Sequence, residues 1–437
     1  MLVARACGGP VDRAATSRSI LGRRRVGATS AALSVLAGAM LVAGPASNAA
    51  ATSVPVAPLV VASTTILSNG GATGMGALTL INTANNVASA PIKVHAFPVA
   101  VGVSSNGATA YVVGAYNDGT GAPGSLISVS TSSHVVGRTV KVPNPIAVAV
   151  PPTGNTVYVL GGFDAASQPV GMLSNLYPVD TATGVIGKVI KVASNPTGIA
   201  VTPNGRDLYV LGTKEITPVV TATFAAAAPV KISSPGMAIA PNSKTAYFLD
   251  PDNLAVLPLA TATNTRGKPI GTGPFVPQAL AVSPNGQDLY VVGPPDAGLG
   301  PGPDYVALQI FNTATGTLHK TVHLGPYSEA GGWAITLTPN GQMAYALGYG
   351  KTSTSQGIVV PVDTVTGVAG APIHVGVNAS TIVASPNGAW VYVLDDGTPP
   401  GGAGPKSAGS VVPIDVATDK AGKAIPLTPY AEVMATS

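Results

Sequence analysis

The sequence predicts an all-β protein made of repeated four-stranded units, and two observations carry this prediction. One pattern occurs seven times: an apolar run, a turn that usually contains Asn-Gly, and a second apolar run with a tyrosine, as in 196–211. Two short apolar runs joined by Asn-Gly are typical of a β-hairpin. The composition agrees, because only 9% of residues are charged while glycines number 53 and prolines 40, which favours strands and tight turns. Regular repetition of such hairpins predicts a β-propeller.

The tyrosine marks the second strand of each copy, and the copies follow one another at intervals of 38 to 55 residues. A single tyrosine at a fixed strand position in each copy indicates core packing. The preceding turn reads Asn-Gly in five copies and Thr153-Gly154 in a sixth. In the remaining copy, Asn242-Ser243, we expect Asn242 to adopt a positive φ. The seven tyrosines are Tyr111, Tyr158, Tyr209, Tyr247, Tyr290, Tyr345 and Tyr392.

Most copies continue with a third strand, a Thr-rich turn and a fourth strand. The third strand at 176–180 precedes Thr-Ala-Thr-Gly at 181–184, and the fourth follows at 189–192. Asp180, Asp363 and Asp415 stand directly before such turns, where Asp commonly forms an Asx turn. Four consecutive strands per copy are the content of one propeller blade.

The two ends of the repeat region complete each other. Residues 59–94 supply a second, third and fourth strand without a first, while 428–436 supply a first strand with nothing after it. Propellers avoid exposed sheet edges by closing the ring. We therefore expect a single propeller over 59–437, with eight blades and its closing blade built from both termini. Seven blades remain the alternative if the N-terminal strands form an extra partial sheet.

The first 49 residues have the features of a secretory signal peptide. Arginines including Arg23, Arg24 and Arg25 precede the apolar stretch 26–42, and small residues around Ala49 offer cleavage sites. The arginines leave general secretion and twin-arginine export both open. Residues 50–58 form a short tether rich in small residues and proline. We therefore expect a secreted or otherwise extracytoplasmic protein with no membrane span after cleavage.

Removing the leader changes the charge of the chain. Six of the 22 Lys and Arg residues and one of the 18 acids lie in 1–49, which leaves 16 bases and 17 acids and a net charge near −1. Such a balance gives no overall electrostatic signal for nucleic acid. The one cysteine, Cys7, also lies in the leader, so the mature chain has no disulfide.

Three short motifs together resemble the YVTN-type repeat. They are Pro-x-x-x-Ala-Val-(Ser/Thr)-Pro-Asn-Gly, the (Leu/Val)-Tyr-Val triplet, and Val-Asp-Thr-Ala-Thr-Gly, which are clearest at 196–211 with 179–184 and at 281–292 with 312–316. The resemblance covers about 59–436. It implies a secreted or periplasmic β-propeller, often grouped with lactonase-like propellers, although members usually have seven blades. This chain mostly has glycine where the family has asparagine after Tyr-Val, as at Gly293 and Gly348.

A propeller has two faces, and we expect binding on the one that carries the connections from second to third strands. Five of these connections are long and irregular: 115–124, 162–173, 294–304, 348–356 and 395–409. Variable loops on a rigid scaffold are the usual place for function. Converging carboxylates there could hold Ca²⁺, although the same residues are also ordinary loop acids. The candidate residues are Asp118, Asp164, Glu215, Asp250, Asp252, Asp304, Asp395 and Asp396.

No sequence pattern for catalysis accompanies these acids. The chain lacks a Gly-x-Ser-x-Gly elbow, a His-Glu-x-x-His motif and a phosphate-binding loop. His95, His323 and His374 share a position at the end of the fourth strand, which is normally outermost, so we do not expect them to meet. We therefore expect a non-catalytic binding or scaffold propeller, a monomer, whose partner is an unidentified protein, cell-surface component or small molecule. The alternative is a lactonase-like hydrolase or lyase with its site at the mouth of the central channel.

Overall fold

The computed structural model describes most of the predicted propeller. The described residues are 59–64, 76–94, 96–115, 124–162, 174–193, 195–296, 305–326, 332–349, 356–397, 408–427 and 430–436. The predicted leader and tether lie outside these ranges. Within them, no helix is long and apolar enough to cross a membrane.

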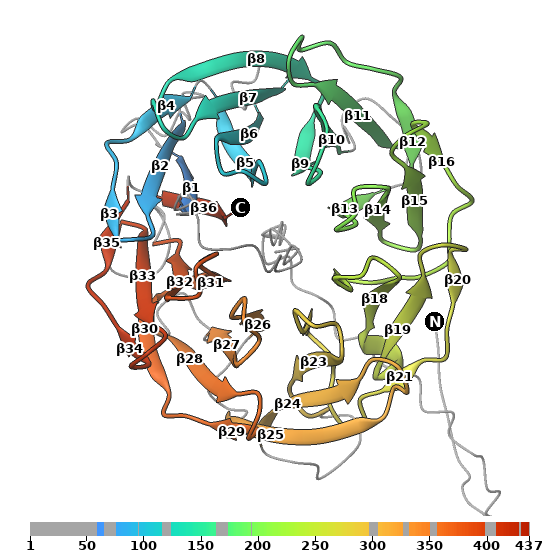
Figure 1. The fold of residues 1–437 in the computed structure, drawn as a ribbon, viewed down its shortest axis with the longest axis vertical. Coiled ribbons are helices and arrows are strands. Elements are labelled where there is room, and N and C mark those ends of the chain that lie inside the picture. Colours follow the sequence, from blue (N-terminus) through green and yellow to red (C-terminus); the bar gives the residue numbers. More distant parts are fainter. Residues whose placement is uncertain are drawn as a thin grey trace, which may run out of the picture. The chain divides into compact units, whose positions relative to one another are not determined.

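The described strands form eight antiparallel sheets, which are the blades of one ring (Figure 1). Blades 2, 3, 4 and 6 each consist of four consecutive strands. Blade 2 contains β5 (Phe97–Val103), β6 (Thr109–Ala115), β7 (Gly124–Ser130) and β8 (Val136–Val142). Blade 3 contains β9 (Pro145–Ala149), β10 (Thr156–Gly161), β11 (Ser174–Asp180) and β12 (Ile190–Val192). Blade 4 contains β13 (Pro196–Val201), β14 (Asp207–Gly212), β15 (Ile216–Val220) and β16 (Ala225–Ala226). Blade 6 contains β22 (Ala279–Val282), β23 (Asp288–Gly293), β24 (Tyr305–Asn312) and β25 (Leu318–Pro326).

In blades 5, 7 and 8 the fourth strand is broken into two short pieces. Blade 5 contains β17 (Met237–Ile239), β18 (Thr245–Asp250), β19 (Ala255–Ala260), β20 (Thr265–Arg266) and β21 (Ile270–Gly271), with the 3₁₀ turn η1 (Pro251–Asn253) between β18 and β19. Blade 7 contains β26 (Gly332–Leu337), β27 (Met343–Tyr349), β28 (Gln356–Asp363), β29 (Val368–Ala369) and β30 (Ile373–Val377). Blade 8 contains β31 (Ala379–Ala384), β32 (Trp390–Asp395), β33 (Ser410–Asp415), β34 (Lys420–Ala421) and β35 (Ile425–Pro426).

Blade 1 closes the ring with strands from both ends of the repeat region. It contains β36 (Tyr430–Ala435), β1 (Leu59–Thr64), β2 (Gly76–Asn82), β3 (Val87–Ala88) and β4 (Ile92–Val94). β1 pairs antiparallel with β36 from Val60 opposite Ala435 to Thr64 opposite Tyr430. The predicted eight blades and the predicted closure are both confirmed.

The hydrophobic core lies between blades. The buried side chains form eight clusters, and each cluster combines residues of two neighbouring blades. One joins Leu160 of blade 3 to Leu208 of blade 4, and another joins Ile81 of blade 1 to Leu394 of blade 8. Because every blade buries both of its surfaces, the strands read as near-continuous apolar runs rather than as strict alternations.

The repeated tyrosines connect neighbouring blades and, except for the half-buried Tyr111, fill the core as predicted. Tyr158, Tyr209, Tyr247, Tyr290, Tyr345 and Tyr392 are at most 2% exposed. Each of these hydroxyl groups with a described hydrogen-bond partner bonds to the turn between the third and fourth strands of the next blade. Tyr209 Oη donates to Asn264 Oδ1 at 3.1 Å and Tyr345 Oη to Asp419 Oδ1 at 2.7 Å. Tyr392 Oη donates to Asn86 Oδ1 at 2.6 Å, which continues the series across the closure. Burial raises the pKa of Tyr158 to about 12, so these phenols stay protonated donors.

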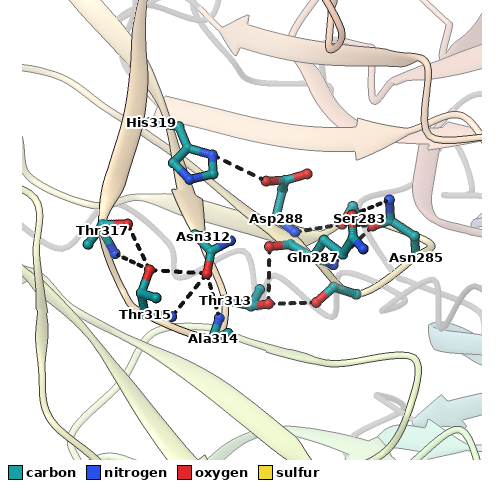
Figure 2. Close-up of polar contacts among 11 residues, drawn as sticks. Ser283, Asn285, Gln287, Asp288, Asn312, Thr313, Ala314, Thr315, Thr317 and His319 are labelled. Carbon is teal, nitrogen blue, oxygen red and sulfur yellow. Dashed lines mark hydrogen bonds and ion pairs between the residues drawn. The ribbon is translucent and has the colours of Figure 1, made fainter.

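The two kinds of short turn lie together on one face, which we call the turn face. In several blades a threonine after the third strand donates to the glycine carbonyl of the first-to-second turn. Thr221 Oγ1 bonds Gly205 O at 2.7 Å and Thr313 Oγ1 bonds Gly286 O at 2.6 Å. Figure 2 shows the blade 6 example, in which Ser283, Asn285, Asn312 and Thr315 also bond within their own turns. The predicted Asx turns are confirmed at Asp180, Asp363 and Asp415, each of which accepts a backbone N–H three residues on.

The structure corrects the expected geometry of the Asn-Gly turns. Only the second residue of each pair has a positive φ, for example +71° at Gly205, so these are not two-residue hairpin turns with two left-handed residues. The asparagine instead uses its side chain: Asn204 Oδ1 accepts the N–H of Arg206 at 3.0 Å. In the copy without glycine, Ser243 and not Asn242 takes the positive φ, +60°. Thr261 Oγ1 donates to the Ser243 carbonyl at 2.6 Å and helps to hold this conformation.

Gly205→Val tests this turn geometry. A Cβ at Gly205 meets nothing closer than 3.5 Å, so the expected loss of unfolding free energy, about 1–2 kcal/mol, comes from the left-handed backbone alone. Chemical denaturation measures it. Gly271→Val is the matched control, because a Cβ there meets no atom within 4 Å and its φ is not left-handed; it should stay within about 0.5 kcal/mol. Equal effects of the two substitutions would contradict the turn assignment.

Candidate functional site

The face opposite the turn face, which we call the loop face, carries the connections from second to third strands. The strand ends that define it include those of β18, β32 and β33. The five long connections predicted for this face lie wholly or largely outside the described residues, at 116–123, 163–173, 297–304, 350–355 and 398–407. The described part of the loop face therefore consists of strand ends, short connections and the segments between blades.

The described candidate acids lie on the loop face as predicted, but they do not converge. Glu215 belongs to blade 4, Asp250 and Asp252 to blade 5, and Asp395 and Asp396 to blade 8. Asp118, Asp164 and Asp304 lie outside the described residues, as does His95. Among the residues with described positions, no three His, Cys, Asp or Glu side chains are grouped so that they could hold a metal ion.

Asp250 has a local structural role. It is the last residue of β18, and its side chain is buried. Both carboxylate oxygens accept hydrogen bonds from Asn253 Nδ2, each at 2.9 Å. The bonds fold the 3₁₀ turn back onto the strand, so this carboxylate organises a turn, whereas Asp252 of the same turn is exposed.

Asp395 is the most unusual of the candidate acids, because its carboxylate is buried with few strong donors. The residue is 6% exposed. Oδ1 accepts the backbone N–H of Gly397 at 3.0 Å, and Ser410 Oγ lies 3.5 Å from Oδ2. Burial raises the pKa of this carboxyl group, because the charged form loses hydration. A Cβ at Gly376 would stand 2.0 Å from Oδ2, so the glycine provides the space that the carboxylate fills.

The surroundings of Asp395 come from two segments that the sequence pattern did not connect. Asp396 Oδ1 accepts a hydrogen bond from Ser380 Oγ at 2.6 Å. Asn378, which has a φ of +58°, donates from Nδ2 to the Gly397 carbonyl at 2.8 Å. The segment between blades 7 and 8 thus fixes the end of β32. Ser380 and Asn378 lie in no motif, so only the three-dimensional packing identifies them.

Most of the described buried polar atoms without partners stand at loop-face ends of strands; the exceptions are Thr79 Oγ1 within β2 and Thr436 Oγ1 after the turn-face end of β36. Among the described residues, Ser125 Oγ, Ser174 Oγ and Trp333 Nε1 are buried and have no hydrogen-bond partner. They stand near the starts of β7, β11 and β26, which are all loop-face ends. A buried unpaired polar atom costs about 1–3 kcal/mol, a cost that an ordered water or ion can offset.

The histidines occupy separate positions. In blade 6, His323 on β25 stacks on Tyr305 of β24, with ring centroids 3.5 Å apart. His319 near the start of β25 lies on the turn-face side, where its Nδ1 is 3.7 Å from Asp288 Oδ1 (Figure 2). His374 lies exposed on β30. The structure thus places His323 and His374 on outer strands of different blades, as expected from the repeat.

The glycines at the position where the YVTN-type repeat has asparagine have a steric explanation. A Cβ at Gly293, the last residue of β23, would stand 1.9 Å from the Val276 carbonyl oxygen. At Gly348 it would meet the indole ring of Trp333 at 2.9 Å. The chain entering the blade passes directly over the end of the second strand, so only glycine fits.

Comparison with known proteins confirms the fold and goes no further. No protein-family profile and no curated protein matches the chain. Solved structures do match. The dihydro-heme d1 dehydrogenase NirN has a TM-score of 0.60 at 11% identity, over 88% of this chain and 77% of that one. The periplasmic gluconolactonase PpgL of Pseudomonas aeruginosa has a TM-score of 0.52 at 16% identity, over 74% and 97%. Hydrazine synthase of Kuenenia stuttgartiensis has a TM-score of 0.50 at 18% identity, over 76% and 96%.

Asp395→Asn tests whether the buried carboxylate is structural. Because the folded pKa is raised, ionised Asp395 opposes folding once the pH exceeds that pKa. The amide should therefore raise the melting temperature at pH 7, and the difference should shrink as the pH falls towards the range in which Asp395 is protonated. Asp252→Asn, on an exposed side chain, is the control and should change the melting temperature little at either pH. A loss of stability with Asp395→Asn at pH 7 would show that the ionised carboxylate is needed in the fold.

Proposed function

We propose that this protein is a secreted, non-catalytic β-propeller that binds a cell-surface component, protein or small molecule through its loop face. The observation that carries the proposal is the contrast between the two faces. On the turn face, serine, threonine, asparagine and aspartate side chains bond within or between their own turns. On the loop face some side chains are bonded, as Asn253 is to Asp250, but among the described residues buried polar atoms such as Ser125 Oγ and Trp333 Nε1 stand without partners.

Three further observations support this proposal. The closed ring and the tyrosine hydrogen bonds provide a rigid frame, and irregular loops on such a frame are the usual place for recognition. The arginine and apolar segments within 1–49 support export. The YVTN-type motifs resemble those of secreted propellers, and one protein of similar structure, PpgL, is a periplasmic gluconolactonase.

A lactonase-like hydrolase is the second candidate, and Asp395 is the observation in its favour. A buried carboxylate with a raised pKa, at the loop-face end of a strand, has the character of a general base. Turnover of simple aliphatic and sugar lactones by the wild-type protein, lost in Asp395→Asn, would establish this function instead of the binding role.

Binding of the purified, labelled mature protein to intact cells of its own organism tests the proposal. The loop-face variant Glu215→Gln/Asp252→Asn raises the net charge by two, and Gln287→Lys/Gln342→Lys raises it equally on the turn face. We expect the first pair to weaken cell binding several-fold and the second to leave it unchanged. Equal effects, or a loss confined to the turn-face pair, would contradict the proposal.

The same binding measurement with and without EDTA examines Ca²⁺. We propose binding without a metal cofactor, so chelation should change neither the bound fraction nor the melting temperature. A decrease that Ca²⁺ restores would instead assign the loop-face acids to a metal site, because selective binding to the folded state raises its stability.

A further inference from the structure

One position of the fourth strand carries a lysine in four consecutive blades. It is the middle residue of an aliphatic-Lys-aliphatic triplet in blades 1 to 4. The flanking residues point into the core and are buried or half-buried, whereas the lysine is exposed. Because side chains alternate along a strand, this pattern sets one lysine on the outside of each blade. The four residues are Lys93, Lys141, Lys191 and Lys231.

The segments that carry these lysines follow one another along one arc of the outer wall. Figure 1 shows β4, β8, β12 and β16 in succession on the outside of the ring. Lys93, Lys141 and Lys191 lie on the first three of these strands, and Lys231 follows β16. Arg138 and Lys188 stand three residues before Lys141 and Lys191 and add charge to blades 2 and 3.

Residues 50–437 contain 16 Lys and Arg and 17 Asp and Glu, and the fold separates these nearly balanced charges. Eleven of the fourteen described lysines and arginines lie in the fourth-strand segments, and no aspartate or glutamate does. The other three, Arg206, Lys214 and Lys244, lie on the two faces. The fourth-strand segments are 87–94, 136–142, 185–192, 225–232, 265–271, 318–325, 368–375 and 420–427.

The four arc lysines are also free of ionic partners. Among the described residues the one ion pair joins His319 and Asp288 in blade 6. Arg138 differs, since its Nη2 donates to the Ala182 carbonyl at 3.0 Å and it helps to keep the pKa of Asp180 low, although the backbone N–H of Thr183 contributes most. Among the described residues, no carboxylate therefore forms an ion pair with Lys93, Lys141, Lys191 or Lys231, although the pairing of Ile216 with Val230 sets Glu215 opposite Lys231.

Lysines on outer strands can also serve to prevent edge-to-edge pairing of sheets. Protection of sheet edges alone does not require a lysine at the same strand position in four neighbouring blades. It also does not require that the fourth-strand segments lack aspartate and glutamate. A row of like charges with repeating spacing matches a linear polymer with repeating negative charges. The four segments of the arc contain no Phe, Tyr or Trp on which bases could stack, and lysine predominates over the forked guanidinium that suits phosphate.

We propose that the outer wall of blades 1 to 4 binds a linear, carboxylated polysaccharide. The lysine ammonium groups contact successive carboxylates of the polymer. This surface is separate from the loop face, so its test is independent of the function proposed above. Contacts of this kind release counterions, and the affinity must therefore fall as salt rises.

Binding of polygalacturonate to the mature protein, measured by calorimetry over a series of salt concentrations, tests this proposal. Lys141→Gln/Lys191→Gln should weaken binding roughly fivefold, as expected for two exposed ion pairs. It should also reduce the steepness of the log–log salt dependence by roughly 1.4, at about 0.7 per lost contact. Arg206→Gln/Lys244→Gln removes the same charge from the turn face and should leave both quantities unchanged.

Failure of polygalacturonate to bind at low salt, or an equal loss of its affinity in the two variant pairs, would overturn the proposal. Two further outcomes would also overturn it: tighter binding of poly(dT) than of polygalacturonate, or stronger self-association of the Lys141→Gln/Lys191→Gln protein with unchanged polymer binding. Tighter binding of poly(dT) would indicate nucleic acid as the partner, and the stronger self-association would leave the lysines as edge protection only. Because all four substituted side chains are exposed, we expect both variants to fold, and melting curves check this.

Discussion

The pairing between β36 and β1 is the interaction on which the rest of the ring depends. Every core cluster lies between two blades, so a ring left open would expose an apolar surface on each side of the gap. The pairing joins residues more than 360 positions apart, Val60 and Ala435 among them. Tyr392 then bonds Asn86 across the last boundary, as Tyr209 and Tyr345 bond across theirs. Closure thus makes the boundary between blades 8 and 1 equivalent to the others.

The architecture could be predicted because the sequence patterns that specify it are local and repeated. Seven blades are marked by a tyrosine in the second strand and by a short turn before it, and the missing first strand before residue 59 matches the surplus strand after 427. The errors concern backbone detail. Asn-Gly indicated a hairpin, but not its turn geometry: Thr202, two residues before Asn204, bonds the asparagine side chain and Gly205 takes the positive φ, whereas in the copy with Ala240 at that position Ser243 takes it. Residue identity alone does not fix the length of such a turn.

The candidate site could be predicted only as a face. The sequence assigned the acids to the second-to-third connections, and Glu215, Asp250 and Asp395 do lie there. It could not show that Asn253 holds Asp250, or that Gly376 leaves room to bury Asp395, because these contacts join separate segments. The row of outer-strand lysines could not be predicted for a similar reason, because its members come from separate segments of the chain. The net charge of residues 50–437, near −1, conceals a separation of charges that appears only when the fourth strands are placed on the outside.

The most direct test of the account is removal of residues 428–437, which deletes β36, combined with hydrogen exchange of the truncated protein. Val433, Met434 and Ala435 are buried in the closing blade. We predict a large fall in the melting temperature and fast exchange of the β1 amides, because that strand loses its partner and its blade loses core contacts. An unchanged melting temperature with full protection of β1 would contradict closure by the two termini.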